Sequence, residues 1–205
     1  AMIPAPERSV ERDAALDALL PNVPFDGWTW RALRQGLAAA GAPPDDAELL
    51  FPGGATDMIE AFLDLADRRM EEGAATLEES RVSRRVRAVI ALRLAQNRPH
   101  KEAIRRAVAV LALPRNARLA ARCTARTVDS IWHAAGDTST DFSWYTKRAI
   151  LSAIFTATML FWLNDASEDD SATLAFLDRR LADLRRPARL RQRASSVLQR
   201  FRRAA

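Results

Sequence analysis

The sequence predicts an all-α fold. Glycine occurs only seven times in 205 residues, and the chain is rich in the strong helix formers alanine, leucine and arginine. Apolar residues recur at helical spacing along almost the whole chain, and we find no convincing alternating strand pattern. With 48% hydrophobic residues the chain can bury a sizeable core. We expect about nine helices in one body, followed by a C-terminal amphipathic helix.

Turn residues divide the N-terminal part into short helices. We expect helices over residues 9–20, 28–40 and 45–51, with Gly41 ending the second and Pro52-Gly53-Gly54 ending the third. A longer helix then begins near Thr56. Its inward face is predicted to carry Met58, Ile59, Phe62, Leu65, Ala66 and Met70.

The remaining helices follow the same signals. We expect them over residues 82–96, 101–111 and 117–134, and Gly136 ends the last of these. Thr140-Asp141 is predicted to cap an apolar helix that continues to about Asn164. Ser171 is predicted to cap another helix, and Pro187 separates the final segment, residues 188–203.

The net charge of +5 hides a division between the two parts of the chain. Residues 1–80 carry 6 arginines against 16 carboxylates, and residues 81–205 carry 25 basic against 10 acidic residues. Such a division predicts that the two parts face different partners. The single cysteine excludes an internal disulfide and fits a reducing compartment. Residues 1–10 lack the apolar core of a signal peptide.

The three N-terminal helices have the layout of a helix-turn-helix module. DNA recognition by such a module requires basic side chains, because neutralising phosphates supplies most of the affinity. The candidate recognition helix instead carries Asp45, Asp46 and Glu48. We therefore expect a helix-turn-helix that serves packing and binds no nucleic acid.

The C-terminal segment predicts membrane contact. Residues 185–205 contain eight arginines and no carboxylate, and their apolar residues share one helical face. A last helix packed on the body and a disordered basic tail are the alternatives. The predicted membrane-binding residues are Arg189, Leu190, Arg193, Val197, Leu198, Arg200 and Phe201.

The most apolar stretch, residues 149–163, is too short to span a bilayer and is predicted to be a buried helix. Before it, residues 132–148 gather two tryptophans, a tyrosine, a phenylalanine and a histidine around a predicted helix-helix turn. Exposed aromatic and arginine side chains at such a turn form a protein-binding hot spot. Core packing is the alternative for these residues.

Three stretches resemble the ubiquinone biosynthesis protein nine family: residues 20–28, residues 132–155 and residues 176–181, with the block from Asp141 to Arg148 the most specific. The resemblance implies a TetR-like fold without DNA binding, a lipid in the cavity where TetR proteins bind effectors, and a C-terminal membrane helix. It also implies docking to the demethoxyubiquinone hydroxylase. The docking residues that it implies are Ile131, Asp141, Trp144, Tyr145 and Arg148.

The resulting prediction is an accessory protein without catalysis or cofactor, cytoplasmic and peripheral on the inner membrane. It would bind an isoprenoid quinone or phospholipid and present the quinone to the hydroxylase, and a homodimer is expected. Its parts would be a vestigial helix-turn-helix with its connecting helix (1–80), a lipid-binding body (81–184) and the membrane helix (188–203). The predicted lipid-binding residues are Phe62, Trp132, Ile154, Phe155, Met159 and Trp162.

Two alternatives remain open. One is a TetR-type transcription regulator with a hydrophobic effector. The other is an enzyme, because Ser130, His133 and Asp137 lie close in sequence, although their place around a helix end favours capping. The two histidines have no metal-ligand spacing, and Pro52-Gly53-Gly54 lacks the lysine of a phosphate-binding loop.

Overall fold

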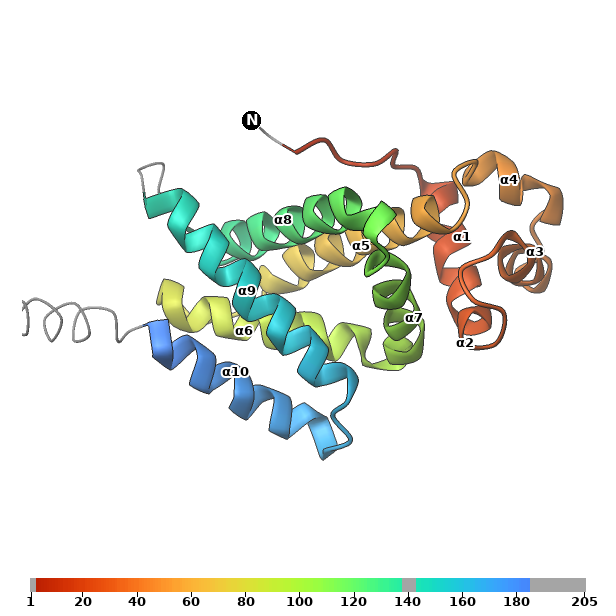
Figure 1. The fold of residues 1–205 in the computed structure, drawn as a ribbon. Helices are drawn as coiled ribbons and strands as arrows, with labels where there is room; N and C mark the ends of the chain where they lie inside the picture. Colours follow the sequence, from red (N-terminus) through yellow and green to blue (C-terminus); the bar gives the residue numbers. More distant parts are fainter. Residues whose placement is uncertain (1–2, 138–142, 185–205) are drawn as a thin grey trace, which may run out of the picture. The chain divides into compact units, whose positions relative to one another are not determined.

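A computed structural model describes residues 3–137 and 143–184 of the chain (Figure 1). Every regular element in these residues is a helix, and eight of the α-helices have ten residues or more. The predicted all-α fold class is therefore confirmed. The α-helices are α1 (Val10–Leu19), α2 (Val23–Asp26), α3 (Trp30–Ala39), α4 (Ala47–Leu50), α5 (Ala55–Ala74), α6 (Val82–Asn97), α7 (Lys101–Leu111), α8 (Ala117–Ala134), α9 (Ser143–Leu163) and α10 (Ser171–Leu184).

The chain divides into two compact units, residues 1–156 and residues 157–205. Helix α9 belongs to both, because the boundary falls inside it. In the first unit α5 packs on both α6 and α8, so the predicted division at residue 80 crosses a continuous packing region. The predicted functional parts 1–80, 81–184 and 188–203 stay predictions.

Helices α1, α3 and α4 form the predicted helix-turn-helix layout. Gly36 lets α3 approach α1 closely, because a Cβ at this position would lie 2.2 Å from the Ala18 carbonyl oxygen. Gly41 ends α3 with a φ of 75°, as predicted. The third helix is shorter than expected: α4 has four residues and follows a 3₁₀ turn over Pro44–Asp46.

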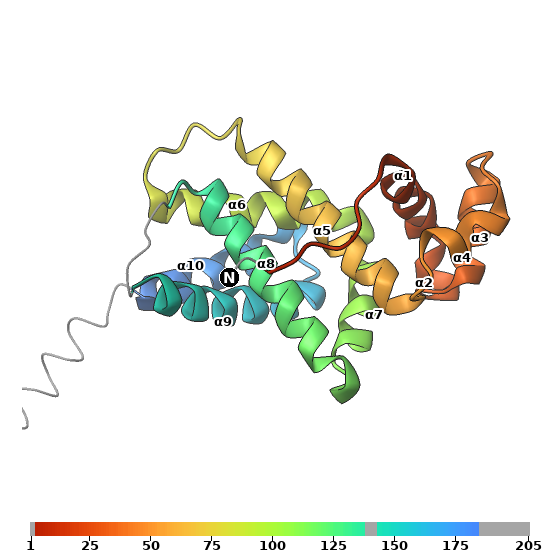
Figure 2. The same ribbon diagram turned by 90° about the horizontal axis from the view of Figure 1, so that it is seen from above.

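Helix α5 lies alongside α8 in both views of the ribbon (Figures 1 and 2). All the residues predicted to form its inward face are buried. Each apolar side chain of this size that leaves water contributes about 1.5–3 kcal/mol to folding. The buried face therefore anchors α5 as the central helix of the first unit.

The same region also buries charged groups that the sequence did not predict. Asp67 of α5 pairs with Arg93 of α6 at 2.9 Å and accepts a hydrogen bond from the Thr127 hydroxyl of α8. Burial raises the pKa of Asp67 to about 6, against the opposing effect of Arg93. Asp67 thus links α5 to α6 through an ion pair and to α8 through hydrogen bonds.

The N-terminal segment is tied across α5 and α8. Arg8 makes two hydrogen bonds to Asp64 of α5, at 2.8 and 2.7 Å. The Pro4 carbonyl accepts a hydrogen bond from Arg126 of α8, which also binds Glu60 of α5. These contacts hold the first residues of the described chain against the body of the unit.

The second unit contains the end of α9 and the whole of α10. Its turn is organised by Asp165, which accepts hydrogen bonds from the Ser167 and Thr173 backbone amides, both at 2.8 Å. These bonds hold the pKa of Asp165 well below its usual range, despite desolvation. Asp165 and Ser167 cap α10, and Ser171 is its first helical residue rather than its cap. Phe161 and Phe176 stack at 4.7 Å between centroids.

Two predicted features lie outside the described residues. These are the Thr140-Asp141 cap and the membrane helix with all its predicted residues, Arg189, Leu190, Arg193, Val197, Leu198, Arg200 and Phe201. In the parts of the chain that are described, no helix combines the length and the apolar character needed to cross a bilayer.

Candidate docking surface between α8 and α9

The candidate site is the corner at which α8 ends and α9 begins. Gly136, with a φ of 79°, ends α8 in the left-handed conformation that glycine adopts without strain. The predicted end of α8 at Ala134 is confirmed. Aromatic and charged side chains from the last turns of α8 and the first turns of α9 gather here.

Trp144, Tyr145 and Arg148 form the α9 side of the corner. The Arg148 guanidinium lies 3.8 Å from the centre of the Trp144 ring, and the Trp144 and Tyr145 rings meet edge to face at 4.7 Å. Tyr145 is 71% exposed, whereas Trp144 is half-buried. The tyrosine therefore offers its ring to a partner from a platform that Trp144 and Arg148 hold in place.

The α8 side of the corner pairs with α9 through charges. Arg148 donates to the Asp129 carboxylate, and the Lys147 ammonium lies 3.7 Å from the carboxylate of Asp137. The Lys147 ammonium also lies 5.9 Å from the centre of the Trp132 ring. Sequence reasoning missed Asp129 and Lys147 and considered Asp137 only as a catalytic or capping residue, although all three stand within or next to the aromatic stretch that it singled out.

Arg85 of α6 fixes the base of this corner. Its guanidinium donates to the carbonyl of Ala134 at 2.7 Å and to the carbonyls of Ala74 and Leu77, both at 2.8 Å. These carbonyls belong to the end of α8, the end of α5 and the following loop. One arginine thus satisfies acceptors that helix ends leave without intrahelical partners.

Two donors at the corner are buried without a hydrogen-bond acceptor in the described chain. They are the Trp132 indole nitrogen and the Nη1 nitrogen of Arg148. Buried donors in proteins are normally paired. Both nitrogens are inaccessible from the surface in this arrangement, so a partner that docks on the corner does not reach them.

The other predicted docking residues are placed differently. Ile131 is fully buried, so its side chain supports the corner from beneath and offers no surface to a partner. Asp141 lies outside the described residues. The structure therefore brings together Trp144, Tyr145 and Arg148 of the predicted set.

The predicted lipid-binding residues do not share one described cavity. Ile154 and Phe155 are buried in the part of α9 that belongs to the first unit, and Trp132 lies at the docking corner. Phe62 lies elsewhere, with its ring 5.4 Å from that of Trp28. In the second unit Trp162 is fully buried and Met159 is half-buried.

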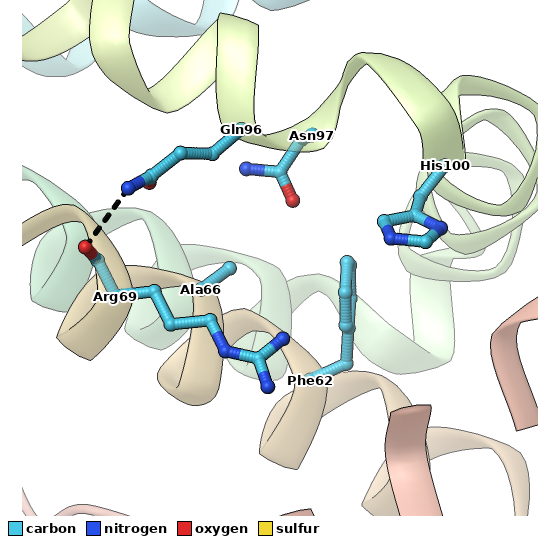
Figure 3. Close-up of a pocket in the computed structure, with 6 residues that line it drawn as sticks. All are labelled: Phe62, Ala66, Arg69, Gln96, Asn97 and His100. Carbon is cyan, nitrogen blue, oxygen red and sulfur yellow. Dashed lines mark hydrogen bonds between the residues drawn. The ribbon is translucent and has the colours of Figure 1, made fainter. Parts of the chain in front are cut away.

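Phe62 lines a small pocket between α5, α6 and the start of α7 (Figure 3). Its volume is about 40 Å³, whereas sites for ligands of drug size occupy about 300–1,000 Å³. This pocket has room for water and not for an isoprenoid tail. Its other lining residues are Ala66, Arg69, Gln96, Asn97 and His100.

The described residues contain no group of three or more histidine, cysteine or carboxylate side chains that could hold a metal ion. Cys123 is buried, and burial raises the pKa of its thiol to about 11. This thiol is therefore protonated at neutral pH and poorly nucleophilic.

The fold defines a TetR-like protein. A solved TetR transcriptional regulator from Nitrosomonas europaea superposes with a TM-score of 0.66 and 23% identity, over 85% of this chain and 97% of that one. At this identity the likeness shows the fold alone. The TetR-like expectation is confirmed.

Sequence comparison then gives the family. The COQ9 family model matches residues 117–187, which span α8, α9 and α10. The mitochondrial ubiquinone biosynthesis proteins COQ9 of Rattus norvegicus and Homo sapiens are each 33% identical over 82% of this chain. That of Schizosaccharomyces pombe is 35% identical over 81%. The chain belongs to the COQ9 family through the region that it shares with these relatives.

The shared region is part of a longer sequence in the relatives. The chain spans 56% of the rat protein, 55% of the human protein and 66% of the fission yeast protein. The family match nevertheless includes the whole docking corner, from Asp129 to Arg148.

Proposed function

We propose that this chain is a lipid-binding accessory protein of ubiquinone biosynthesis, which binds isoprenoid quinone intermediates at a membrane surface and presents them to a hydroxylase. One observation carries the proposal. The COQ9 family match spans the helices that hold the docking corner and most of the predicted lipid-binding residues. The relatives are named ubiquinone biosynthesis proteins.

The docking part of the proposal rests on the exposed Tyr145 ring and the Trp144–Arg148 stack beneath it. Tyrosine, tryptophan and arginine are the residues most enriched in protein-binding hot spots. The exposed Tyr145 ring is therefore the contact that this corner offers to a partner protein. In this proposal that partner is the demethoxyubiquinone hydroxylase.

The lipid part rests on the apolar character of α9. Ile154 and Phe155 are buried at 7% and 8% exposure, and they flank the docking corner on the same helix. An isoprenoid chain bound along such a helix would be held next to the partner's docking surface. The protein then performs no chemistry itself and delivers the substrate to the hydroxylase.

The membrane part rests on the sequence of residues 188–203. Each arginine near an anionic leaflet contributes about 1 kcal/mol of attraction. Reversible attachment through this segment would let the protein collect a quinone from the bilayer.

Reconstitution tests the proposal as a whole. We expect the purified chain to retain the hydroxylase on beads and to raise its turnover of a demethoxyubiquinone embedded in vesicles. The same chain with Tyr145→Lys should lose both effects. Retention and turnover that do not change with this substitution would contradict the presentation mechanism.

A transcription regulator is the second candidate, because the fold is TetR-like. Its recognition element opposes this function, since Asp45 and Glu48 are exposed where phosphates would lie. A gel shift with genomic fragments at low salt separates the candidates. Sequence-specific duplex binding that weakens with salt would support the regulator, and we expect none.

A further inference from the structure

The turn between α7 and α8 presents apolar side chains among arginines. Leu113 is 36% exposed, and Ala112 and Pro114 are exposed beside it. In the first unit this turn lies at the edge, away from α1 and α3 (Figure 2). Its apolar tip therefore faces solvent.

Arginines outnumber carboxylates around this tip, although Glu102 of α7 and Glu60 of α5 each pair with two of them. Residues 103–128 contain six arginines and no carboxylate. Arg115 lies within the turn's 3₁₀ segment, Pro114–Asn116, and Arg118 lies in the first turn of α8. Both are exposed, and neither has an ion-pair partner among the described residues. Arg105 and Arg106 of α7 share the single carboxylate of Glu102, at 3.1 and 3.6 Å.

The turn is held rigidly by its own hydrogen bonds. The Asn116 side chain donates to the Val110 carbonyl at 2.8 Å, and the Asn116 amide donates to the Leu113 carbonyl at 2.8 Å. The Ala112 amide continues the α7 pattern to Val108. Because the turn is ordered in advance, binding through its tip would cost little conformational entropy.

We propose that this turn, residues 111–118, is a membrane contact that inserts Leu113 and Pro114 shallowly into an anionic lipid surface while Arg115 and Arg118 bind headgroup phosphates. An apolar tip with unpaired arginines matches the two components of interfacial binding, burial of apolar area and attraction to anionic lipid. An acidic protein surface would satisfy the arginines, but it offers no apolar layer for the tip.

This contact lies on α7 and α8 and is separate from residues 188–203. It adds a second attachment point to the membrane part of the proposed function. Simultaneous engagement of both contacts with one bilayer would retain the chain more strongly than either alone, because each raises the effective concentration of the other at the surface.

The single cysteine allows a site-specific test on the full chain. Cys123 is 3% exposed and its thiol pKa is raised to about 11, so an added surface cysteine is the reactive one. Leu113→Cys is labelled with an environment-sensitive fluorophore and mixed with vesicles of phosphatidylcholine containing phosphatidylglycerol. The matched control is Leu49→Cys, which is 80% exposed on the acidic α4.

We expect the label at position 113 to shift to the blue and to be quenched by shallow lipid-borne quenchers, and the label at position 49 to stay unchanged. Adding Arg115→Gln with Arg118→Gln should weaken the vesicle response at position 113 about thirtyfold, at about fivefold per arginine. Circular dichroism of each variant checks that the helices are intact.

Three results would overturn the proposal. If the chain sediments with vesicles while the label at position 113 is silent, the turn is no membrane contact, although the C-terminal contact stands. If the chain does not sediment at all, both membrane contacts fail, and quinone binding is decided separately by extraction. If the label responds to soluble poly-glutamate and not to vesicles, the turn binds acidic protein.

Discussion

The guanidinium carbon of Arg148 lies over the ring of Trp144, 3.8 Å from its centre and one helical turn away along α9. The same guanidinium binds Asp129 of α8. One arginine therefore fixes the tryptophan and joins the two helices of the docking corner. Tyr145, which meets Trp144 edge to face, is left exposed above this support.

Tyr145→Lys should abolish binding of the hydroxylase and leave the fold intact. The side chain is 71% exposed, so its loss removes little buried area, while a charge replaces the aromatic contact. Co-precipitation and thermal unfolding measure the two effects. Leu49→Lys, at 80% exposure on α4, is the control that should keep binding. Loss of binding together with a large fall in melting temperature would place Tyr145 in the core.

Substitution at the half-buried Trp144 is the less selective experiment. Its ring supports both Tyr145 and Arg148, so Trp144→Lys should weaken binding and destabilise the corner together. Co-precipitation and thermal unfolding of this variant are therefore read beside those of Tyr145→Lys, which should lose binding alone.

Arg85→Ala should destabilise the chain by about 2–4 kcal/mol, because it leaves buried carbonyls at the ends of α5 and α8 without a donor. Arg84→Ala is the matched control. Arg84 is 60% exposed and 4.0 Å from Glu79, and its loss should change the free energy of unfolding by less than about 0.5 kcal/mol. Urea unfolding measures the free energy of unfolding of both variants. Equal losses in the two variants would show that the Arg85 hydrogen bonds contribute little to stability.

The free energy of unfolding should carry a pH dependence from Asp67. Its pKa in the folded chain is raised to about 6 from an ordinary 3.8, so the folded state holds this proton more tightly than the unfolded state. The stability that this tighter proton binding contributes to the free energy of unfolding is fully present below about pH 4 and is lost as the pH rises through about 6. Asparagine does not titrate, so Asp67→Asn removes this fall in stability with rising pH.

Asp67→Asn should therefore be less destabilising at pH 7 than at pH 4, by about 1–3 kcal/mol. Denaturant unfolding of both chains across this range measures the difference. If Asp67→Asn lowers the free energy of unfolding more at pH 7 than at pH 4, the ion pair with Arg93 outweighs desolvation. The double variant with Arg93→Met then gives the coupling energy of the pair.

Particular elements show what the sequence could predict. The bounds of α7 and α8 agree with the expected ranges, because proline, glycine and helical periodicity mark both ends. The inward face of α5 follows from spacing alone. The four-residue α2 was not predicted, and α4 was predicted as the longer helix 45–51, because the bounds of both depend on packing and on 3₁₀ turns that periodicity does not encode.

Buried charges were the larger omission. Asp67, Arg93 and Arg126 look like solvated polar positions in the sequence, and only their partners on distant helices allow their burial. For the same reason, only part of the candidate site was predicted from the sequence. Trp144, Tyr145 and Arg148 share one local stretch, whereas Arg85 reaches the corner from another helix.

Removal of residues 188–205 should lower binding to anionic vesicles by about tenfold or more, since most of the segment's arginines and its apolar face are lost together. Co-sedimentation with and without phosphatidylglycerol, at low and high salt, measures the change. Binding that stays the same after the deletion would end the assignment of this segment to the membrane.

The most direct test of the central claim is native mass spectrometry of the purified chain, with organic extraction of what is released. We predict a bound isoprenoid quinone or a phospholipid, and displacement of that phospholipid by added quinone. A chain that carries no lipid and takes up no quinone from vesicles would contradict the proposed function.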